Sequence, residues 1–209
     1  MKSESLIFDI DGTLWDSRQL VAEGYNIQLQ AEGMGHIVVN ADMLRPLFGK
    51  VMTDIADVLL ASVPVPERYA LMERCMETEN RYLEENPCHI GYPGVRKTLM
   101  ELKKRYRLFI VSNSQCGYPE LCISKMGLED LIEGHMCFGD TGTSKGQTIL
   151  RLMREHNIQS AVYIGDTQGD YEATVEAGIP FVFATYGLGE AENCAARIHS
   201  FSDLLTMEL

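Results

Sequence analysis

The fold of this chain is constrained most by a series of short apolar runs, each of which ends at small polar or acidic residues. The first run, Leu6–Ile10, is followed at once by an acidic residue and a glycine. Further runs of this kind lie at residues 108–111, 161–164, 179–184 and, more weakly, 135–138. Between them, apolar residues recur at helical spacing, as in Val95, Leu99 and Leu102. Strands that alternate with helices predict an α/β protein with a doubly wound parallel sheet.

One long segment breaks this alternation. From residue 16 to residue 87 there is no apolar run of strand length between turn signals, and helix-forming residues are punctuated by glycines and prolines. Within it, residues 67–85 carry spaced apolar side chains among acidic ones and predict a long helix. We therefore predict a core made of residues 1–15 and 88–209, with residues 16–87 as a small α-helical cap inserted after the first strand.

Composition narrows the functional classes. The 209 residues include 30 acidic and 18 basic side chains, so the formal net charge is −12. This balance argues against nucleic acid as a partner, since a phosphate backbone selects basic surfaces. No run reaches the ~18 apolar residues of a membrane helix, and the apolar run at residues 6–8 is too short for a signal peptide. We expect a cytoplasmic protein with no membrane partner.

The six cysteines include no C-x-x-C pair. In a cytoplasmic protein, such cysteines are expected to be reduced thiols. We interpret each as a small buried hydrophobic residue rather than as a nucleophile or a metal ligand.

Two acidic residues lie at the end of the first predicted strand. Asp9 and Asp11 are two positions apart, so both side chains face the same side of an extended chain, and Gly12 allows a sharp turn. Two close carboxylates repel each other, which predicts a bound cation or a shared proton. A turn capped by one aspartate explains either residue alone but explains the pair poorly.

Polar residues also follow the other predicted strands, and parallel strands place ligand sites at their carboxyl ends. Ser112 and Asn113 offer a hydroxyl and amides for an anion, although such pairs are also common in turns. Lys145 lies at a predicted helix start and can neutralise phosphate, although a lone lysine is usually exposed. Asp166 and Asp170 suit a hard divalent cation such as Mg²⁺, although Asp170 also fits a helix cap.

Taken together, these groups resemble the haloacid dehalogenase superfamily of phosphohydrolases. The shared pattern is Asp-x-Asp-Gly-Thr, then serine, then lysine, then Gly-Asp-x-x-x-Asp, and it covers residues 6–12 and about 93–187. Residues 8–17, with Pro93-Gly94-Val95 and Ala177-Gly178, resemble the phosphoglycolate phosphatase and β-phosphoglucomutase branch. A helical insert after the first motif is similar to that superfamily's small cap.

The resemblance implies a role for each matching residue. Asp9 would be the nucleophile that forms an aspartyl-phosphate. Asp11 would protonate the leaving alcohol and then activate water. Ser112 and the Asn113 amide would bind phosphoryl oxygens, and Lys145 would neutralise charge.

The resemblance also implies Mg²⁺ as the cofactor. Asp9, Asp166 and the main-chain carbonyl of Asp11 would be its ligands. Asp170 would ligate the metal or orient its waters.

The function expected from these residues is that of a Mg²⁺-dependent phosphatase acting on a small phosphorylated metabolite, such as phosphoglycolate, a sugar phosphate or a nucleotide monophosphate. A phosphomutase of the β-phosphoglucomutase type shares every motif. A signalling protein phosphorylated on aspartate is a third alternative, but receiver domains lack an insert of this size. In the cap, Arg45, Lys50 and the Phe48-Gly49 turn are candidates to contact the substrate, although surface charge explains Arg45 and Lys50 equally well.

Overall fold

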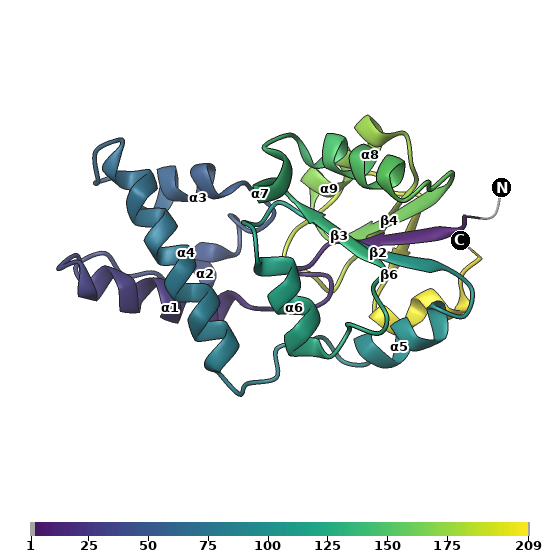
Figure 1. Cartoon of the computed structure of the whole chain (residues 1–209), viewed down its shortest axis with the longest axis horizontal. Helices are drawn as coiled ribbons and strands as arrows, with labels where there is room; N and C mark the ends of the chain where they lie inside the picture. Colours follow the sequence, from purple (N-terminus) through teal and green to yellow (C-terminus); the bar gives the residue numbers. More distant parts are fainter. Residues whose placement is uncertain (1–2, 209) are drawn as a thin grey trace.

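A six-stranded sheet forms the centre of the computed structural model, which describes residues 3–208 (Figure 1). The strands are β1 (Ser5–Phe8), β2 (Arg107–Ser112), β3 (Gly134–Cys137), β4 (Ala161–Gly165), β5 (Phe181–Ala184) and β6 (Ala196–Ile198). Their order is β3-β2-β1-β4-β5-β6, and every neighbouring pair is parallel. The chain starts at the middle of the sheet, fills one side and then returns to fill the other. The predicted doubly wound α/β fold is confirmed.

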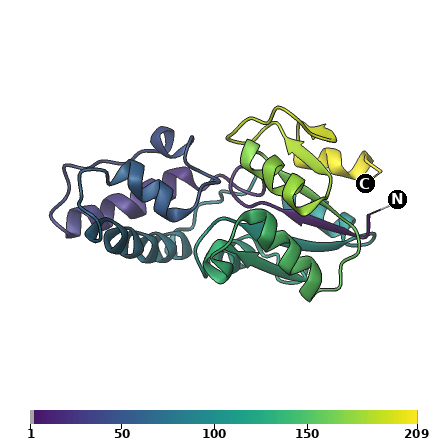
Figure 2. The ribbon, with the colours of Figure 1, turned by 90° about the horizontal axis from the view of Figure 1, so that it is seen from above.

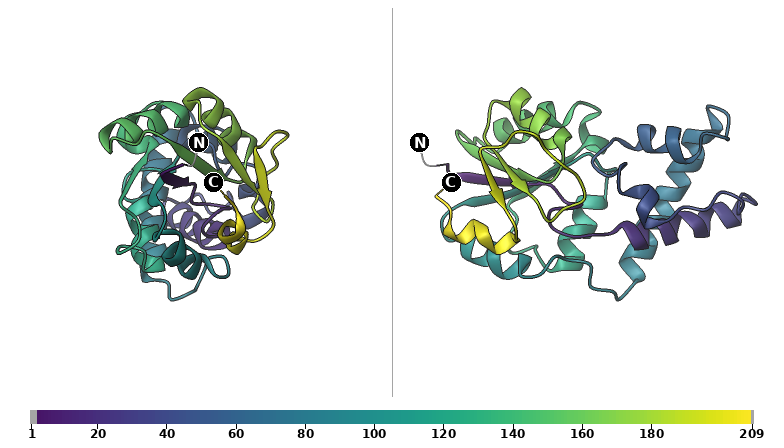
Figure 3. Two further views of the ribbon diagram at one scale, coloured as in Figure 1. Left: turned by 90° about the vertical axis from the view of Figure 1, so that its right-hand side faces the viewer. Right: turned by 180° about the vertical axis from the view of Figure 1, so that it is seen from behind.

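Helices cover both faces of the sheet, as the end-on view in Figure 3 shows. On one face lie α5 (Val95–Leu102), α6 (Tyr118–Met126) and the 3₁₀ helix η1 (Phe201–Thr206). On the other face, α8 (Lys145–Glu155) packs against α9 (Gln168–Ala177). The short helix α7 (Phe138–Thr141) directly follows β3. Because both faces are covered, the strands β1, β2, β4 and β5 are apolar over most of their length rather than alternating.

The segment without strands forms a helical lobe beside the sheet (Figure 2). Its helices are α1 (Arg18–Ala31), α2 (Ala41–Leu44), α3 (Met52–Leu59) and α4 (Glu67–Glu85), and both α1 and α3 pack against α4. The long helix predicted at residues 67–85 is therefore confirmed.

Two short stretches of chain connect this lobe to the core, and they run side by side. The amide of Asp16 donates to the carbonyl of Ile90 at 2.9 Å, and the amide of Tyr92 donates to the carbonyl of Leu14 at 3.0 Å. The division of the chain at residues 15/16 and 87/88 remains a prediction.

Two differences from the sequence prediction concern the end of the first strand and an additional strand. The first strand ends at Phe8 rather than Ile10, so Asp9 is the first residue beyond it. The three-residue strand β6 was not predicted, because it lies at the sheet edge and has exposed Arg197 at its centre instead of an apolar run. Neither difference moves the carboxyl edge of the sheet.

Candidate active site

The predicted residues meet where the central strands end. Strand β1 pairs with β2 and with β4, so that Phe8 lies opposite Ile110 and Ile164. Asp9 follows β1, Ser112 is the last residue of β2, and Asp166 follows β4. The parallel register thus brings residues that are more than 150 positions apart to one edge of the sheet.

Lys145 forms the charged centre of this group. From the first turn of α8, its Nζ donates to Asp9 Oδ1 at 2.9 Å and to Asp170 Oδ1 at 2.7 Å, and the exposed fractions of the three side chains are 5%, 4% and 0%. Burial raises the pKa of the Asp9 carboxyl, and the Lys145 ammonium opposes that rise. Burial lowers the pKa of Lys145, but Asp170 and Asp9 outweigh it and raise this pKa above its usual value. The lysine therefore stays charged beside Asp9.

Asp166 is held by backbone amides and leaves one oxygen free. Its Oδ2 accepts hydrogen bonds from the amides of Leu188 at 2.6 Å and Gly189 at 3.2 Å. Its Oδ1 is buried and has no hydrogen-bond partner among the described residues. Gly12 makes this packing possible, since its φ is +80° and a Cβ there would lie 2.0 Å from Asp166 Oδ2.

The geometry fits a divalent cation. Carboxylate oxygens of Asp9, Asp166 and Asp170 lie within 4.8 Å of one another. Oxygen ligands are those that Mg²⁺ prefers, and it usually binds one or two carboxylates together with water and substrate phosphate. A buried carboxylate oxygen without a donor is costly unless it is paired, and a cation would pair Asp166 Oδ1.

Asp170 organises the turn between β4 and α9. Its Oδ2 accepts from the Asp166 amide at 3.1 Å, from the Thr167 amide at 3.0 Å and from the Thr167 hydroxyl at 2.7 Å. Its Oδ1 accepts from Lys145. Thr167 is the N-cap of α9 and completes a capping box with Asp170. Both oxygens of Asp170 therefore have donors already, which suits a positioning role.

Asp11 is half-buried and sits on a separate hydrogen-bond network. Its Oδ1 accepts from the Trp15 indole at 2.8 Å, the Ser17 hydroxyl at 2.6 Å and the Tyr118 hydroxyl at 2.9 Å. Burial raises its pKa to about 6, although all three donors lower it. The sequence prediction missed these donors. Trp15 and Ser17 lie within the first motif and could have been found there, whereas Tyr118 is 107 positions away.

Ser112 and Asn113 form the next part of the rim. Ser112 is buried, and its hydroxyl accepts from the Ser114 amide at 3.2 Å. The Asn113 side chain donates to the carbonyl of Gly49 at 2.7 Å, so it connects the core to the helical lobe. A second connection joins Arg45 Nε to the carbonyl of Leu188 at 3.0 Å. The lobe is therefore in contact with the sheet edge in this structure.

A cavity of about 40 Å³ lies between the sheet edge and the helical lobe. One water occupies roughly 10–15 Å³ by the same measure, so the cavity accommodates only a few waters. Asp9 and Asp11 lie on its core side, and its lobe side includes Phe48, Gly49 and Lys50. Of the predicted lobe candidates, these three line the cavity and Arg45 does not. The sequence prediction missed five further lobe residues that line it, namely Val21, Tyr25, Met52, Ile55 and Glu79.

The cysteines are partly as predicted. All six are free thiols, and Cys75, Cys122 and Cys137 are buried. The expectation of a buried hydrophobic residue is wrong for Cys88 and Cys116, which are exposed because they lie on loops.

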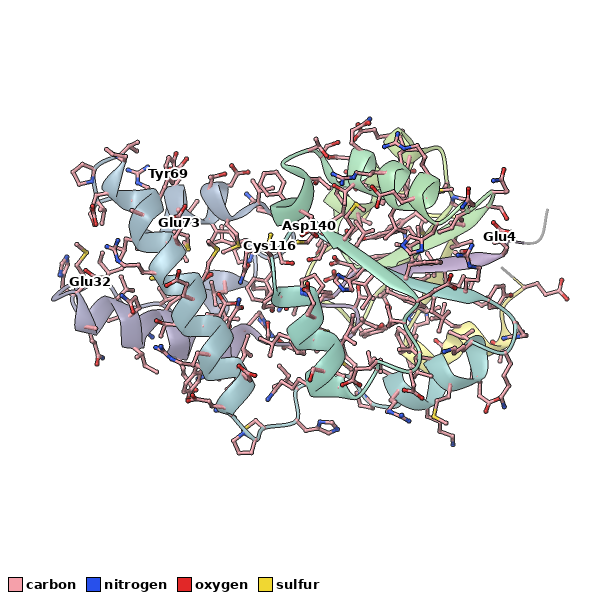
Figure 4. The ribbon with its side chains drawn as sticks, viewed as in Figure 1. Glu4, Glu32, Tyr69, Glu73, Cys116 and Asp140 are labelled. Carbon is pink, nitrogen blue, oxygen red and sulfur yellow. The ribbon has the colours of Figure 1, made fainter. Side chains whose placement is uncertain are left out.

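Cys116 and Cys137 form a second group with Asp140, and none of these three residues lines the cavity. Figure 4 labels Cys116 and Asp140. The thiols of Cys116 and Cys137 donate to Asp140 at 3.5 and 3.1 Å.

Comparison with known proteins identifies the family. The family model described as haloacid dehalogenase-like hydrolase matches residues 6–184, most of the chain. The chain belongs to the haloacid dehalogenase-like hydrolases. The phosphoglycolate phosphatase of Rhodobacter capsulatus is 28% identical over 96% of this chain and 94% of its own length. The phosphorylated carbohydrates phosphatase of Thermotoga maritima is 24% identical over 86% of this chain and 84% of its own length.

The fold of this haloacid dehalogenase-like hydrolase also occurs in solved structures. A haloacid dehalogenase-like family protein from Streptococcus pneumoniae matches with a TM-score of 0.80 and 19% identity, over 98% of this chain and 97% of the other. The predicted superfamily, fold and enzyme class, a phosphatase of this superfamily, are confirmed. No helix among the described residues is long and apolar enough to cross a membrane.

Proposed function

We propose that this haloacid dehalogenase-like hydrolase is a Mg²⁺-dependent phosphatase that hydrolyses a small phosphomonoester through an aspartyl-phosphate on Asp9. The observation that carries the proposal is the buried contact of Asp9, which lines the cavity, with Lys145, together with the unpartnered Oδ1 of Asp166 in the same carboxylate group. A nucleophile, a cation and an open cation-binding oxygen are thus gathered at one point of the sheet edge.

In the first step, an oxygen of Asp9 forms a bond to phosphorus while the bond to the leaving alcohol breaks. Asp11 supplies the proton that the leaving oxygen needs. Its pKa of about 6, raised by burial, leaves a usable protonated fraction near neutral pH. In the second step, the Asp11 carboxylate takes a proton from water, which attacks phosphorus and releases Asp9. A carboxylate nucleophile divides one difficult displacement into two easier ones.

The remaining groups reduce the repulsion between Asp9 and a phosphate dianion. Lys145 supplies a fixed positive charge at Asp9. The Ser112 hydroxyl and the Asn113 amide bind phosphoryl oxygens. Bound Mg²⁺, held by Asp9, Asp166 and the Asp11 carbonyl, would supply further positive charge at the phosphoryl group. Both oxygens of Asp170 already have donors, so we assign it to orienting Lys145 and Asp166 rather than to direct ligation.

The test is phosphate release from a panel of small phosphomonoesters, including 2-phosphoglycolate, sugar phosphates and nucleotide monophosphates, with and without Mg²⁺. We expect Mg²⁺-dependent release, and a loss on the order of 10⁴-fold or more in Asp9→Asn, because the nucleophile is removed. Asp57→Asn is the control, since Asp57 lies on the lobe outside the cavity lining. Phosphorylation of Asp9 by a phosphodonor without phosphate release would instead indicate a mutase or a signalling protein.

A further inference from the structure

Glu79 is a buried carboxyl group on the lobe side of the cavity, and the proposed chemistry does not use it. It lies on α4, is 3% exposed, and lines the same cavity as Asp9 and Asp11. Its Oε2 is buried and has no hydrogen-bond partner among the residues the structure describes. Buried polar atoms are normally paired, so an unpaired oxygen beside the cavity indicates a position where a group of the ligand binds.

The position of Glu79 on its helix is also unusual. Residues on the buried face of α4 recur at helical spacing, and Cys75 and Leu83 lie one turn before and one turn after Glu79. An apolar residue would continue this face. At Gly24 of the neighbouring helix α1, a Cβ would lie 2.8 Å from the Glu79 Cα, so the two helices pack tightly where the carboxyl group is placed. The backbone of Glu79 therefore packs closely against α1, and the side chain is buried there rather than exposed to solvent.

The groups around Glu79 are neutral or acidic. The Tyr25 hydroxyl of α1 and the Gln115 side chain lie beside its carboxyl group, Cys75 lies one turn away, and Asp11 adds negative potential. Burial raises the pKa of Glu79 to about 8, while Tyr25 partly opposes the rise. Near neutral pH the carboxyl group is therefore largely protonated, and it can donate one hydrogen bond and accept another.

The cavity has little positive charge to offer a leaving group. Among the described residues that line it, the one cation is Lys50, which is exposed. Lys145 is committed to Asp9 and Asp170. An ionised carboxylate buried against Glu79 would lack a buried cationic partner, which is costly. A hydroxyl group would be satisfied there, because it both donates and accepts.

We propose that Glu79, with Tyr25 beside it, binds a hydroxyl group on the leaving alcohol and so selects a short hydroxylated phosphomonoester over one that carries a carboxylate. This inference rests on the proposed phosphatase function and names its substrate class. The small cavity limits the alcohol to a short chain. Val21, Phe48 and Ile55 pack against the carbon atoms of the alcohol, and Glu79 binds its hydroxyl group.

The test uses three esters that differ only in one terminal group: ethyl phosphate, 2-hydroxyethyl phosphate and 2-phosphoglycolate. We expect kcat/KM of the wild type for 2-hydroxyethyl phosphate to exceed that for each of the other two by ~10-fold or more, since a buried hydrogen bond is made only with the hydroxyl. In Glu79→Leu the preference over ethyl phosphate disappears. In Glu79→Gln the preference over ethyl phosphate is retained in part, because the amide still donates and accepts.

The control is Glu73→Gln, an exposed glutamate of the same helix (Figure 4), which should keep all three wild-type ratios. Equal rates for the three esters, or faster hydrolysis of 2-phosphoglycolate, would overturn the inference and leave the phosphatase standing. So would wild-type ratios in a folded Glu79→Leu protein. If the wild type and the control hydrolyse none of the esters tested, including the wider panel, the phosphatase function itself fails and the inference fails with it.

Discussion

Two buried carboxyl groups face the cavity from opposite sides, and their surroundings differ. On the core side, Asp9 contacts Lys145, which also binds Asp170. On the lobe side, no cation among residues 3–208 lies beside Glu79, and one of its oxygens has no partner there. The core side is thus organised to hold charge, as phosphoryl transfer requires. The lobe side is organised for a neutral polar group, so charge and specificity are handled by separate parts of the molecule.

The largest effect is expected when Lys145, the cation of the core side, is removed. Lys145→Met should lower kcat/KM by ~10³-fold or more, because the repulsion between Asp9 and phosphate is no longer offset. It should also lower the free energy of unfolding by about 3–5 kcal/mol, since Asp9 and Asp170 are left buried without their partner. Enzyme assays and urea unfolding measure the two effects. Lys97→Met, at an exposed position, is the control.

On the lobe side, removing the ionisable group of Glu79 should raise the free energy of unfolding at high pH instead of lowering it. The pKa of Glu79 is raised to about 8 from 4.5, so the folded state holds the proton more tightly than the unfolded state. Its contribution to stability is therefore present below about pH 4.5 and is lost as the pH rises through about 8. Glu79→Gln should match the wild type at pH 5 and be more stable at pH 9, by on the order of 2–4 kcal/mol.

Urea unfolding at both pH values measures this difference, with Glu73→Gln as the matched control. An equal stability difference at pH 5 and pH 9 would mean that Glu79 is ionised in the folded protein across this range.

The core side and the lobe side of the cavity also differ in how well they could be predicted from the sequence. Asp9, Ser112 and Asp166 lie at the ends of apolar strands, and a parallel sheet places all such positions at one edge, so their meeting was predictable. Glu79 did leave a signal, since it interrupts the apolar spacing between Cys75 and Leu83. That signal was hidden by the many acidic residues of α4.

Other features could not be read from local patterns. Tyr118 contacts Asp11 only because α6 packs beside the first loop of the core. The edge strand β6 has only three residues and no apolar run. Both depend on how distant segments of the chain pack against each other, whereas the central strands are specified by their own residues.

A third experiment tests whether the unpaired oxygen of Asp166 binds a cation, unlike the unpaired oxygen of Glu79. Asp166→Asn removes a proposed metal ligand and should raise the Mg²⁺ concentration needed for half-maximal activity by at least about 10-fold, since loss of a residue that only orients a ligand already weakens metal binding by that much. Without Mg²⁺, it should leave the free energy of unfolding unchanged or increase it, because burial disfavours the ionised carboxylate and raises the pKa of Asp166. Calorimetric titration of Mg²⁺ checks the affinity without relying on turnover. Unchanged Mg²⁺ affinity would contradict the assignment of Asp166.

The smallest effect is expected where the two sides touch. Asn113→Ala removes the hydrogen bond from the Asn113 side chain to the Gly49 carbonyl, while its main-chain amide remains for phosphate. One such bond contributes about 1 kcal/mol, so we expect KM to rise by only about fivefold. Arg45→Met, which removes the contact with the Leu188 carbonyl outside the cavity, should raise KM similarly. If instead Asn113→Ala lowers kcat strongly and Arg45→Met does not, the Asn113 side chain contacts the phosphoryl group. The groups that bind the phosphoryl oxygens would then include this side chain and not only the main-chain amide of Asn113.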